Sequence, residues 1–328
     1  MLYKNILHLI GNTPIIKLNT LSGIRNNNIF AKLESYNPTG SLKDRPALLM
    51  IEDAEEKGIL EPGGTIIEST SGNLGVSLAL IGAMKGYKVI CIVDPKTPEP
   101  SILSMKAFGA QLIMVDVRDA DGSYQKNRIE KAKEIHKKIP KSFIPNQYSN
   151  PNNPLSHSIA TAKEILNDLG KNIDFLVCSV STCGHICGIA RTLKEQVRKV
   201  KIIAVEPEGS VIFGGIPKPY AQTGIGLSFI PENADMELID DYFKVSDKDA
   251  FETTKKLIKE EGLMIGISSG SAAYAALQIS NINESKNIVC VFPDRGERYL
   301  NKLIKTEFVE EPLLEIAIHE HRPNNYAH

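Results

Sequence analysis

A lysine stands where a turn-rich loop meets a helix, in the segment NPTGSLKDRP at residues 37–46. Proline, glycine and serine are typical of a turn, and residues 47–58 have the pattern of a helix that ends at a glycine. Lys43 is therefore expected in or just before the first helical turn, where the helix dipole does not favour a cation. Burial there would lower its pKa from about 10.4 and make the amine a neutral nucleophile. The alternative is a solvated surface lysine.

Three other segments place small polar residues beside the start of a helix. Residues 69–75 (STSGNLG) and 181–185 (STCGH) each follow an apolar, strand-like run, and residues 266–270 (GISSG) precede a helical pattern. Hydroxyl groups, unobstructed backbone N–H groups and a helix N-terminus together bind anions. One such loop is weak evidence because helix caps look similar. Three of them, together with the lysine loop, indicate a shared ligand site.

A cofactor with a phosphate, a polar ring and a carbonyl that condenses with an amine would use all four segments. Lys43 would supply the amine, and loop 181–185 would bind the phosphate. Asn73 would donate to a ring hydroxylate, and Ser268 would face a ring nitrogen. Pyridoxal phosphate has these features. A serine at the ring nitrogen leaves the pyridine largely unprotonated, which favours β-elimination and replacement over transamination.

The rest of the chain alternates apolar strands with amphipathic helices. Strands are expected at residues 64–70, 88–94, 110–117, 174–180, 201–207, 241–246 and 287–294. Helices are expected at residues 73–86, 100–109, 125–139, 160–170, 188–200, 247–262 and 269–279. This alternation predicts an α/β protein with parallel sheets covered on both faces. Ligands of such sheets bind at the carboxyl ends of the strands.

The turn-rich segment 145–158 is the expected crossing between two sheet-centred units. We expect two doubly wound parallel-sheet domains. The larger, cofactor-binding domain comprises residues 1–40 and 150–310, and the smaller, mobile domain comprises residues 41–149. Residues 311–328 are expected to form a C-terminal tail.

Composition argues against several classes of function. Lys and Arg total 38 against 39 Asp and Glu, which leaves a formal net charge of −1 and no electrostatic footprint for nucleic acid or a membrane surface. The sequence lacks an apolar run of about 18 residues and a signal-peptide pattern, so we expect a cytoplasmic protein. Cys183 and Cys187 have C-x₃-C spacing without a second pair, and no metal site is predicted.

Five motifs occur in order between residues 37 and 300: NPTGSLKDR, ESTSGNLG, VSTCGHICG, GISSGS and PDRGERYL. Together they resemble the cysteine synthase and cystathionine β-synthase family, which are pyridoxal phosphate enzymes of fold type II, the fold of the tryptophan synthase β subunit. The resemblance implies a homodimer in which Lys43 forms a Schiff base with the cofactor and moves the Cα proton. It implies that Asn73 contacts the 3′-oxygen and Ser268 the pyridine nitrogen.

The same resemblance implies two further sets of contacts. The cofactor phosphate would be bound by Ser181, Thr182, Cys183, Gly184 and His185. The substrate α-carboxylate would be bound by Ser69, Thr70, Ser71 and Gly72, with loop closure over the substrate. His185 either binds the phosphate through its side chain or caps its helix through its backbone, and we favour the backbone role. Asp294 is interpreted as a structural turn residue or a participant in the site.

Departures from the usual motifs resemble one branch of the family. The phosphate loop is STCGH instead of G-T-G-G-T, the C-terminal motif contains Arg295, and residues 209–214 (GSVIFG) and 223–232 (TGIGLSFIPE) look closer to that branch. The branch makes N-(2-amino-2-carboxyethyl)-L-glutamate, a precursor of 2,3-diaminopropionate in siderophores such as staphyloferrin B. The likeness implies O-phospho-L-serine and L-glutamate as substrates. Phosphate would leave to give an aminoacrylate, which the glutamate amine attacks.

Substrate choice would then involve residues at the mouth of the site. Tyr148 and Ser181 are expected there. Arg128 is a candidate to pair with the dianionic phosphate of the substrate, because a bidentate guanidinium suits that group. The alternative for Arg128 is an ordinary helix-surface arginine beside Glu130 and Glu134.

Two other functions compete with this reading. Within the same family, the alternative is a cysteine synthase that uses O-acetyl- or O-phosphoserine and sulfide. From a different class, an NAD-dependent dehydrogenase is suggested only by the α/β alternation. The sequence argues against it, because no strand is followed by G-x-G-x-x-G with an acidic residue about 20 positions later. We therefore predict a pyridoxal-phosphate-dependent transferase (EC 2.5.1 type) that catalyses β-replacement on small amino-acid substrates.

Overall fold

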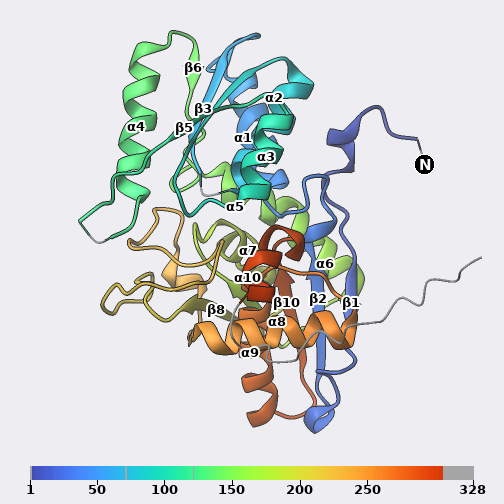
Figure 1. Ribbon diagram of the computed structural model, residues 1–328. Coiled ribbons are helices and arrows are strands. Elements are labelled where there is room, and N and C mark those ends of the chain that lie inside the picture. Colours follow the sequence, from blue (N-terminus) through green and yellow to red (C-terminus); the bar gives the residue numbers. More distant parts are fainter. Residues whose placement is uncertain (1, 71, 121, 306–328) are drawn as a thin grey trace, which may run out of the picture.

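The computed structural model describes residues 2–70, 72–120 and 122–305 and contains two sheets, each flanked by helices (Figure 1). The larger sheet has the strand order β1-β2-β10-β7-β8-β9, and only β1 is antiparallel to its neighbour. Its strands are β1 (Ile15–Lys17), β2 (Asn28–Leu33), β7 (Phe175–Ser179), β8 (Lys201–Pro207), β9 (Asp241–Val245) and β10 (Asn287–Phe292).

The smaller sheet is parallel throughout and has the order β5-β4-β3-β6. Its strands are β3 (Thr65–Ser69), β4 (Lys88–Val93), β5 (Gln111–Met114) and β6 (Ser142–Phe143). The predicted α/β fold with two parallel-sheet units is confirmed. The exact domain boundaries and the mobility of the smaller unit stay predictions.

The predicted helices are present close to their predicted positions, and two short helices, at residues 152–156 and 300–305, were not predicted. Those around the smaller sheet are α1 (Asp44–Glu56), α2 (Asn73–Lys85), α3 (Glu99–Ala107) and α4 (Gln125–Lys138). The others are α5 (Asn152–Ser156), α6 (Ala162–Leu169), α7 (Gly184–Gln196), α8 (Asp247–Glu261), α9 (Ile267–Ile282) and α10 (Leu300–Lys305). In the described part of the chain, none is both long and apolar enough to cross a membrane.

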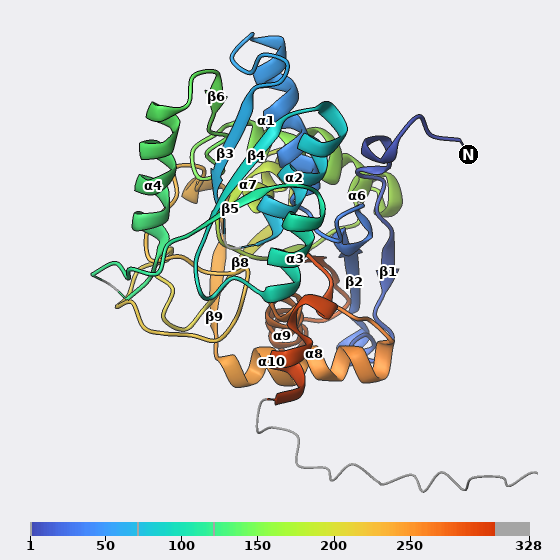
Figure 2. The ribbon, with the colours of Figure 1, turned by 45° about the horizontal axis from the view of Figure 1, so that its top comes forward.

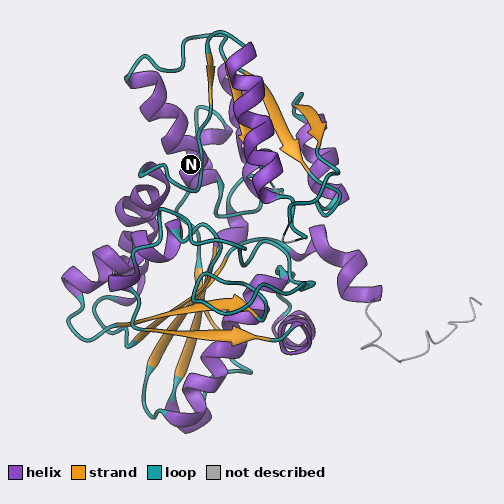
Figure 3. Ribbon diagram, turned by 90° about the vertical axis from the view of Figure 1, so that its left-hand side faces the viewer, coloured by secondary structure: helices purple, strands orange, loops and turns teal. Residues whose placement is uncertain are grey.

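Both faces of each sheet are buried, which explains the uninterrupted apolar strands. In β7, Val177 packs into the core beneath α8 and α9, whereas its neighbour Leu176 packs into the core beneath α7. In β3, Ile66 faces α1 and α2, and Ile67 faces α4. Figures 2 and 3 show these layers of helix, sheet and helix. Successive strand residues point to opposite faces, so a strand covered on both sides must be apolar at every position.

The segment 145–158, expected to be a loop, is partly helical. It enters α5 at Asn152 and continues through a π-helical turn, η4 (His157–Thr161), into α6. Asn153 is 1% exposed, and its side-chain amide donates to the Gln147 carbonyl oxygen at 2.7 Å and to Thr182 Oγ1 at 3.1 Å. These tertiary hydrogen bonds override the turn preference of a segment rich in asparagine and proline.

A buried ion network joins the start of α1 to the larger sheet. The Arg45 guanidinium donates to Glu34 Oε2 at 2.7 Å and to Glu164 Oε1 at 2.7 Å. Lys32 of β2 lies 2.8 Å from Glu164 Oε2, and its side chain and that of Glu34 are 0% exposed. Because α1 begins at Asp44, this network also anchors the loop that carries Lys43.

Replacing Arg45 with methionine is expected to lower the free energy of unfolding by about 3 kcal/mol, because Glu34 would keep a buried charge without its main cationic partner. Urea denaturation followed by circular dichroism measures this change. Lys57→Met removes an exposed ion pair with Asp53 on the same helix and is the matched control, with no measurable loss expected. Equal denaturation midpoints for the two variants would show that the network does not stabilise the fold.

Candidate active site

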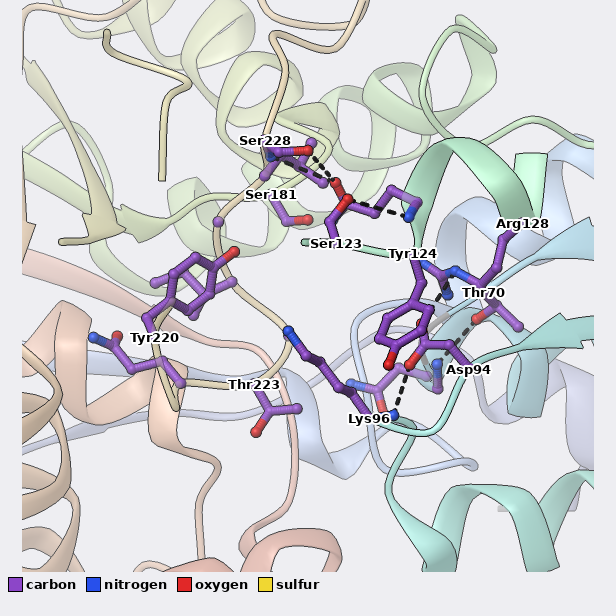
Figure 4. Close-up of a pocket in the computed structure, with 18 of the residues that line it drawn as sticks. Thr70, Asp94, Lys96, Ser123, Tyr124, Arg128, Ser181, Tyr220, Thr223 and Ser228 are labelled. Carbon is purple, nitrogen blue, oxygen red and sulfur yellow. Dashed lines mark hydrogen bonds and ion pairs between the residues drawn. The ribbon is translucent and has the colours of Figure 1, made fainter. Parts of the chain in front are cut away.

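The Lys43 side chain lines a cavity of about 270 Å³ between the two sheet-centred units. Lys43 is the N-cap residue of α1, as the sequence predicted. The walls come from the loops after β3, β4, β5 and β6 on one side and from residues 181–182 and 209–228 on the other. Figure 4 shows side chains from both walls directed into this space. The cavity thus lies at the carboxyl ends of parallel strands, where α/β proteins bind ligands.

Burial lowers the pKa of the Lys43 amine to about 8, while the nearby Cys183, Asp294 and Glu68 oppose this shift. The direction is the one expected from the sequence, and its main cause is desolvation of the charged form. At a pH a little above neutrality, a substantial fraction of this amine is neutral. A neutral, cavity-lining amine can attack an aldehyde and can also accept a proton.

The N-terminus of α7 approaches the same cavity. Ser181 and Thr182 line the wall, and Cys183 follows in the left-handed conformation with φ of 58°. No side chain caps this helix, so its first N–H groups can bind an anion. Glycine is required at position 184, because a Cβ atom there would lie 2.1 Å from Asn153 Oδ1.

The His185 side chain does not line the cavity. It is 5% exposed, and its ring packs against His157 with a centroid separation of 6.0 Å. Burial lowers the pKa of His185 to about 3, so the ring is neutral. This placement favours the backbone role over a side-chain contact with the phosphate.

Asn73 belongs to a hydrogen-bonded group at the start of α2. Its amide nitrogen donates to Asp294 Oδ2 at 2.6 Å, and its oxygen accepts from Arg298. Tyr299 donates its hydroxyl to the same Asp294 oxygen at 2.5 Å. Asp294 is 2% exposed and contacts Asn73, so it is not merely a turn residue. Asn73 also lines the cavity, where its side chain can contact a ligand.

The proposed substrate loop is only partly exposed to the cavity. Thr70 and Gly72 line it, and Thr70 Oγ1 accepts from the backbone nitrogens of Gly72 and Gly75, each at 3.1 Å. Ser69 is 2% exposed and does not reach the cavity wall, and Ser71 lies outside the described residues. Ser268 is buried in the first turn of α9, also outside the cavity wall.

The alternative interpretation of Arg128, as an ordinary arginine on a helix surface, is wrong. Its side chain lines the cavity and is 2% exposed, and its Nε lies 3.2 Å from Asp94 Oδ2. Within the described chain, neither Nε nor Nη1 has a hydrogen-bond partner. Arg128 and Ala132 are four residues apart, so both lie on the face of α4 that packs inward. Tyr148 also lines the cavity, with its ring edge to face against Phe229.

Glu68 is a buried carboxyl group near this site that sequence reasoning did not identify. It is 1% exposed in β3, and its Oε2 has no hydrogen-bond partner in the described chain. Burial raises its pKa to about 8, although backbone hydrogen bonds and Arg128 oppose the shift. The only signal in the sequence is an acidic residue inside the apolar run TIIES.

Glu68→Gln is expected to make the protein more stable than the wild type at pH 8, by more than about 1 kcal/mol, and nearly equal in stability at pH 4.5. The native carboxyl holds its proton up to a pKa of about 8, above the ordinary value of 4.5 in the unfolded chain. The native state therefore binds more protons between these values, and the contribution of Glu68 to stability falls as pH rises through that window. Urea denaturation at pH 4.5, 6 and 8 measures the difference in the free energy of unfolding between the variant and the wild type. A difference that does not change with pH would contradict the prediction.

Pyridoxal phosphate, which the resemblance implies, fits the residues present. Lys43 would hold its aldehyde, the uncapped N-terminus of α7 would hold its phosphate, and Asn73, which lines the cavity, would contact a ring oxygen. When bound, the cofactor supplies an electron sink for reactions at the α-carbon of an amino acid.

Comparison with known proteins agrees with this fit. A family model for pyridoxal-phosphate dependent enzymes matches residues 6–294. The chain is 41% identical to a cysteine synthase from Staphylococcus aureus over 300 residues, which cover 90% of this chain and 95% of that protein.

Two crystal structures share the fold. A hydrogen sulfide-producing enzyme from Fusobacterium nucleatum is 40% identical, with a TM-score of 0.86 and coverage of 91% of this chain and 100% of that one. An O-acetylserine dependent cystathionine β-synthase from Helicobacter pylori is 38% identical, with a TM-score of 0.86 and coverage of 92% and 98%. The chain therefore belongs to the pyridoxal-phosphate-dependent enzymes of fold type II, in the family of the cysteine synthases and cystathionine β-synthases.

Proposed function

We propose that this β-replacement enzyme exchanges the phosphate of O-phospho-L-serine for the amine of L-glutamate, giving N-(2-amino-2-carboxyethyl)-L-glutamate. The observation that carries the proposal is the buried guanidinium of Arg128 in the cavity wall, which forms an ion pair with Asp94 and still has N–H groups that lack a hydrogen-bond partner in the described chain. A buried donor of this kind has a strong preference for an anionic ligand. Lys43, Tyr148 and Ser181 line the same cavity.

The roles proposed for the other residues follow from the family resemblance. Lys43 holds the cofactor and carries the proton to and from the substrate α-carbon. The N-terminus of α7, from Ser181 to His185, binds the cofactor phosphate, and Asn73 and Ser268 contact its ring. Residues 69–72 bind the substrate α-carboxylate through hydroxyl and backbone N–H groups.

We also propose a setting for the reaction. The enzyme acts as a cytoplasmic homodimer, and the smaller unit, residues 41–149, moves against the larger one when substrate binds. Its product supplies 2,3-diaminopropionate for siderophore synthesis. These features rest on the family resemblance.

A cysteine synthase that uses sulfide is the second candidate, and the relatives' names favour it. The S. aureus relative is named cysteine synthase. A relative of similar identity is named O-acetylserine dependent cystathionine β-synthase, so identity near 40% does not determine the acceptor. The charged cavity wall is the reason to rank glutamate first, because sulfide needs no cationic side chain beyond the site of chemistry.

The test is a product assay with the holoenzyme. O-phospho-L-serine and O-acetyl-L-serine are each incubated with L-glutamate or sulfide, and the products are identified by mass spectrometry. The proposal expects phosphate release and the glutamate adduct from O-phospho-L-serine. Rapid cysteine formation without any glutamate adduct would instead support the second candidate.

A further inference from the structure

The cavity wall carries far more positive than negative charge, although the whole chain has a formal net charge of −1. Among the described residues that line it, one is acidic, Asp94, and it already pairs with Arg128. Six are cationic: Lys43, Lys96, Arg118, Arg128, Lys218 and Lys302. A cleft lined by one sign of charge attracts ligands of the opposite sign.

Two of these cations converge on one aromatic ring at the outer part of the cavity. Lys96 Nζ lies 5.9 Å from the centroid of the Tyr124 ring, and Arg118 Cζ lies 5.5 Å from it. Arg118 Nε also donates to the Tyr124 hydroxyl at 3.1 Å. In the described part of the chain, no carboxylate forms an ion pair with Lys96 or Arg118. Tyr124 thus holds two cations together without neutralising them.

A third cation approaches from the opposite wall. Lys302 of α10 donates from Nζ to the Ala221 carbonyl oxygen at 3.2 Å and to Thr223 Oγ1 at 3.1 Å. Figure 4 shows Lys96 reaching across the space between Tyr124 and Thr223. Burial lowers the pKa of Lys302, and the like charge of Lys96 lowers it further, while Asp247 opposes both effects. Two like charges that face each other across a cavity repel, and an anion bound between them offsets this repulsion because it attracts both.

We propose that Lys96, Arg118 and Lys302 form an outer anion subsite, which binds the side-chain carboxylate of an amino-dicarboxylate acceptor. The assignment rests on the proposed function, and it adds the residues that would select this class of acceptor over sulfide or neutral amino acids. Arg128 and Lys43 lie in the same cavity and are proposed to serve the donor substrate and the cofactor. The two groups of cations thus divide the cavity between donor and acceptor.

The test measures equilibrium binding of glutarate to the holoenzyme by isothermal titration calorimetry. Glutarate has two carboxylates and no amine, so it can occupy the subsite without reacting. Butyrate, with one carboxylate, is the probe for the contribution of the second charge. The wild type is expected to bind glutarate more tightly than butyrate.

Lys96→Gln and Lys302→Gln should each weaken glutarate binding on the order of five-fold, and the double variant on the order of 25-fold. Lys96→Arg should bind glutarate about as tightly as the wild type, because this variant keeps the positive charge. Lys126→Gln makes the same charge change on an exposed residue of α4 outside the cavity wall and should leave binding unchanged. Equal affinity in the double variant and the wild type, or no glutarate binding to either, overturns the subsite.

This outcome is separable from that of the product assay. Glutarate binding that depends on Lys96, without a glutamate adduct, would support the anion subsite and overturn the acceptor assignment. If the Lys96 and Lys302 variants form the glutamate adduct and bind glutarate as the wild type does, the reaction is supported and the subsite is overturned.

Discussion

Lys43→Ala is expected to lower kcat/KM for β-replacement by about 10³-fold or more, because one change removes the group proposed both to anchor the cofactor covalently and to move the α-proton. A coupled assay for phosphate release measures the loss. Borohydride reduction of the wild-type holoenzyme, followed by peptide mapping, should place the cofactor label on Lys43. The variant should carry no reduced label.

The matched control is Lys57→Ala, which removes an exposed lysine at the other end of α1 and should retain full activity.

The pH dependence of cofactor uptake gives an independent readout. The Lys43 amine has a pKa of about 8, so wild-type apoenzyme should take up pyridoxal phosphate faster as pH rises through that value. A label found on another lysine would contradict the assignment of Lys43.

Arg128→Gln is expected to lower kcat/KM for O-phospho-L-serine by about 10²-fold, because it removes the charge-assisted hydrogen bonds that the buried guanidinium is proposed to donate to the dianionic phosphate. O-acetyl-L-serine has no such anion on its leaving group, so its kcat/KM should change much less. Arg128→Lys should recover only part of the loss, since an ammonium group keeps the charge but not the bidentate geometry. Steady-state kinetics with both donors measure this shift in specificity.

Removing Arg128 also leaves Asp94 without its ion-pair partner, so stability must be separated from specificity. The double variant Arg128→Met with Asp94→Asn removes both charges and avoids an unpaired buried carboxylate. Thermal denaturation and cofactor absorbance report whether each variant is folded and loaded. If both donors lose activity equally in a folded variant, Arg128 does not recognise the phosphate.

The fold class was predictable from local sequence pattern alone. Strands buried on both faces must be apolar at consecutive positions, and β4 and β7 show this directly in the runs KVICIV and FLVCS. The loops with glycine and hydroxyl residues were predictable as well, because small polar residues between a strand pattern and a helix pattern mark the start of a helix, although no N-cap side chain bonds the start of α2, α7 or α9. These are short-range requirements, so a single sequence reveals them.

The position of Lys43 at the N-cap of α1 followed from the same local rules. The family and the cofactor were also predictable, since five motifs in order carry the resemblance and the family model confirms it. The acceptor was not predictable to the same degree. Relatives near 40% identity bear the names of different synthases.

The tertiary structure decided which polar residues meet. Asn73 bonds Asp294 across 221 positions in the sequence, and Arg128 is buried in the cavity wall although its neighbours on α4 suggested a surface helix. Lys96 and Lys302 face one cavity from two different walls. Local propensity carries no information about such pairs, because burial and long-range electrostatics arise only when the two sheets pack together. The charges that would choose the substrate are therefore a property of the folded chain.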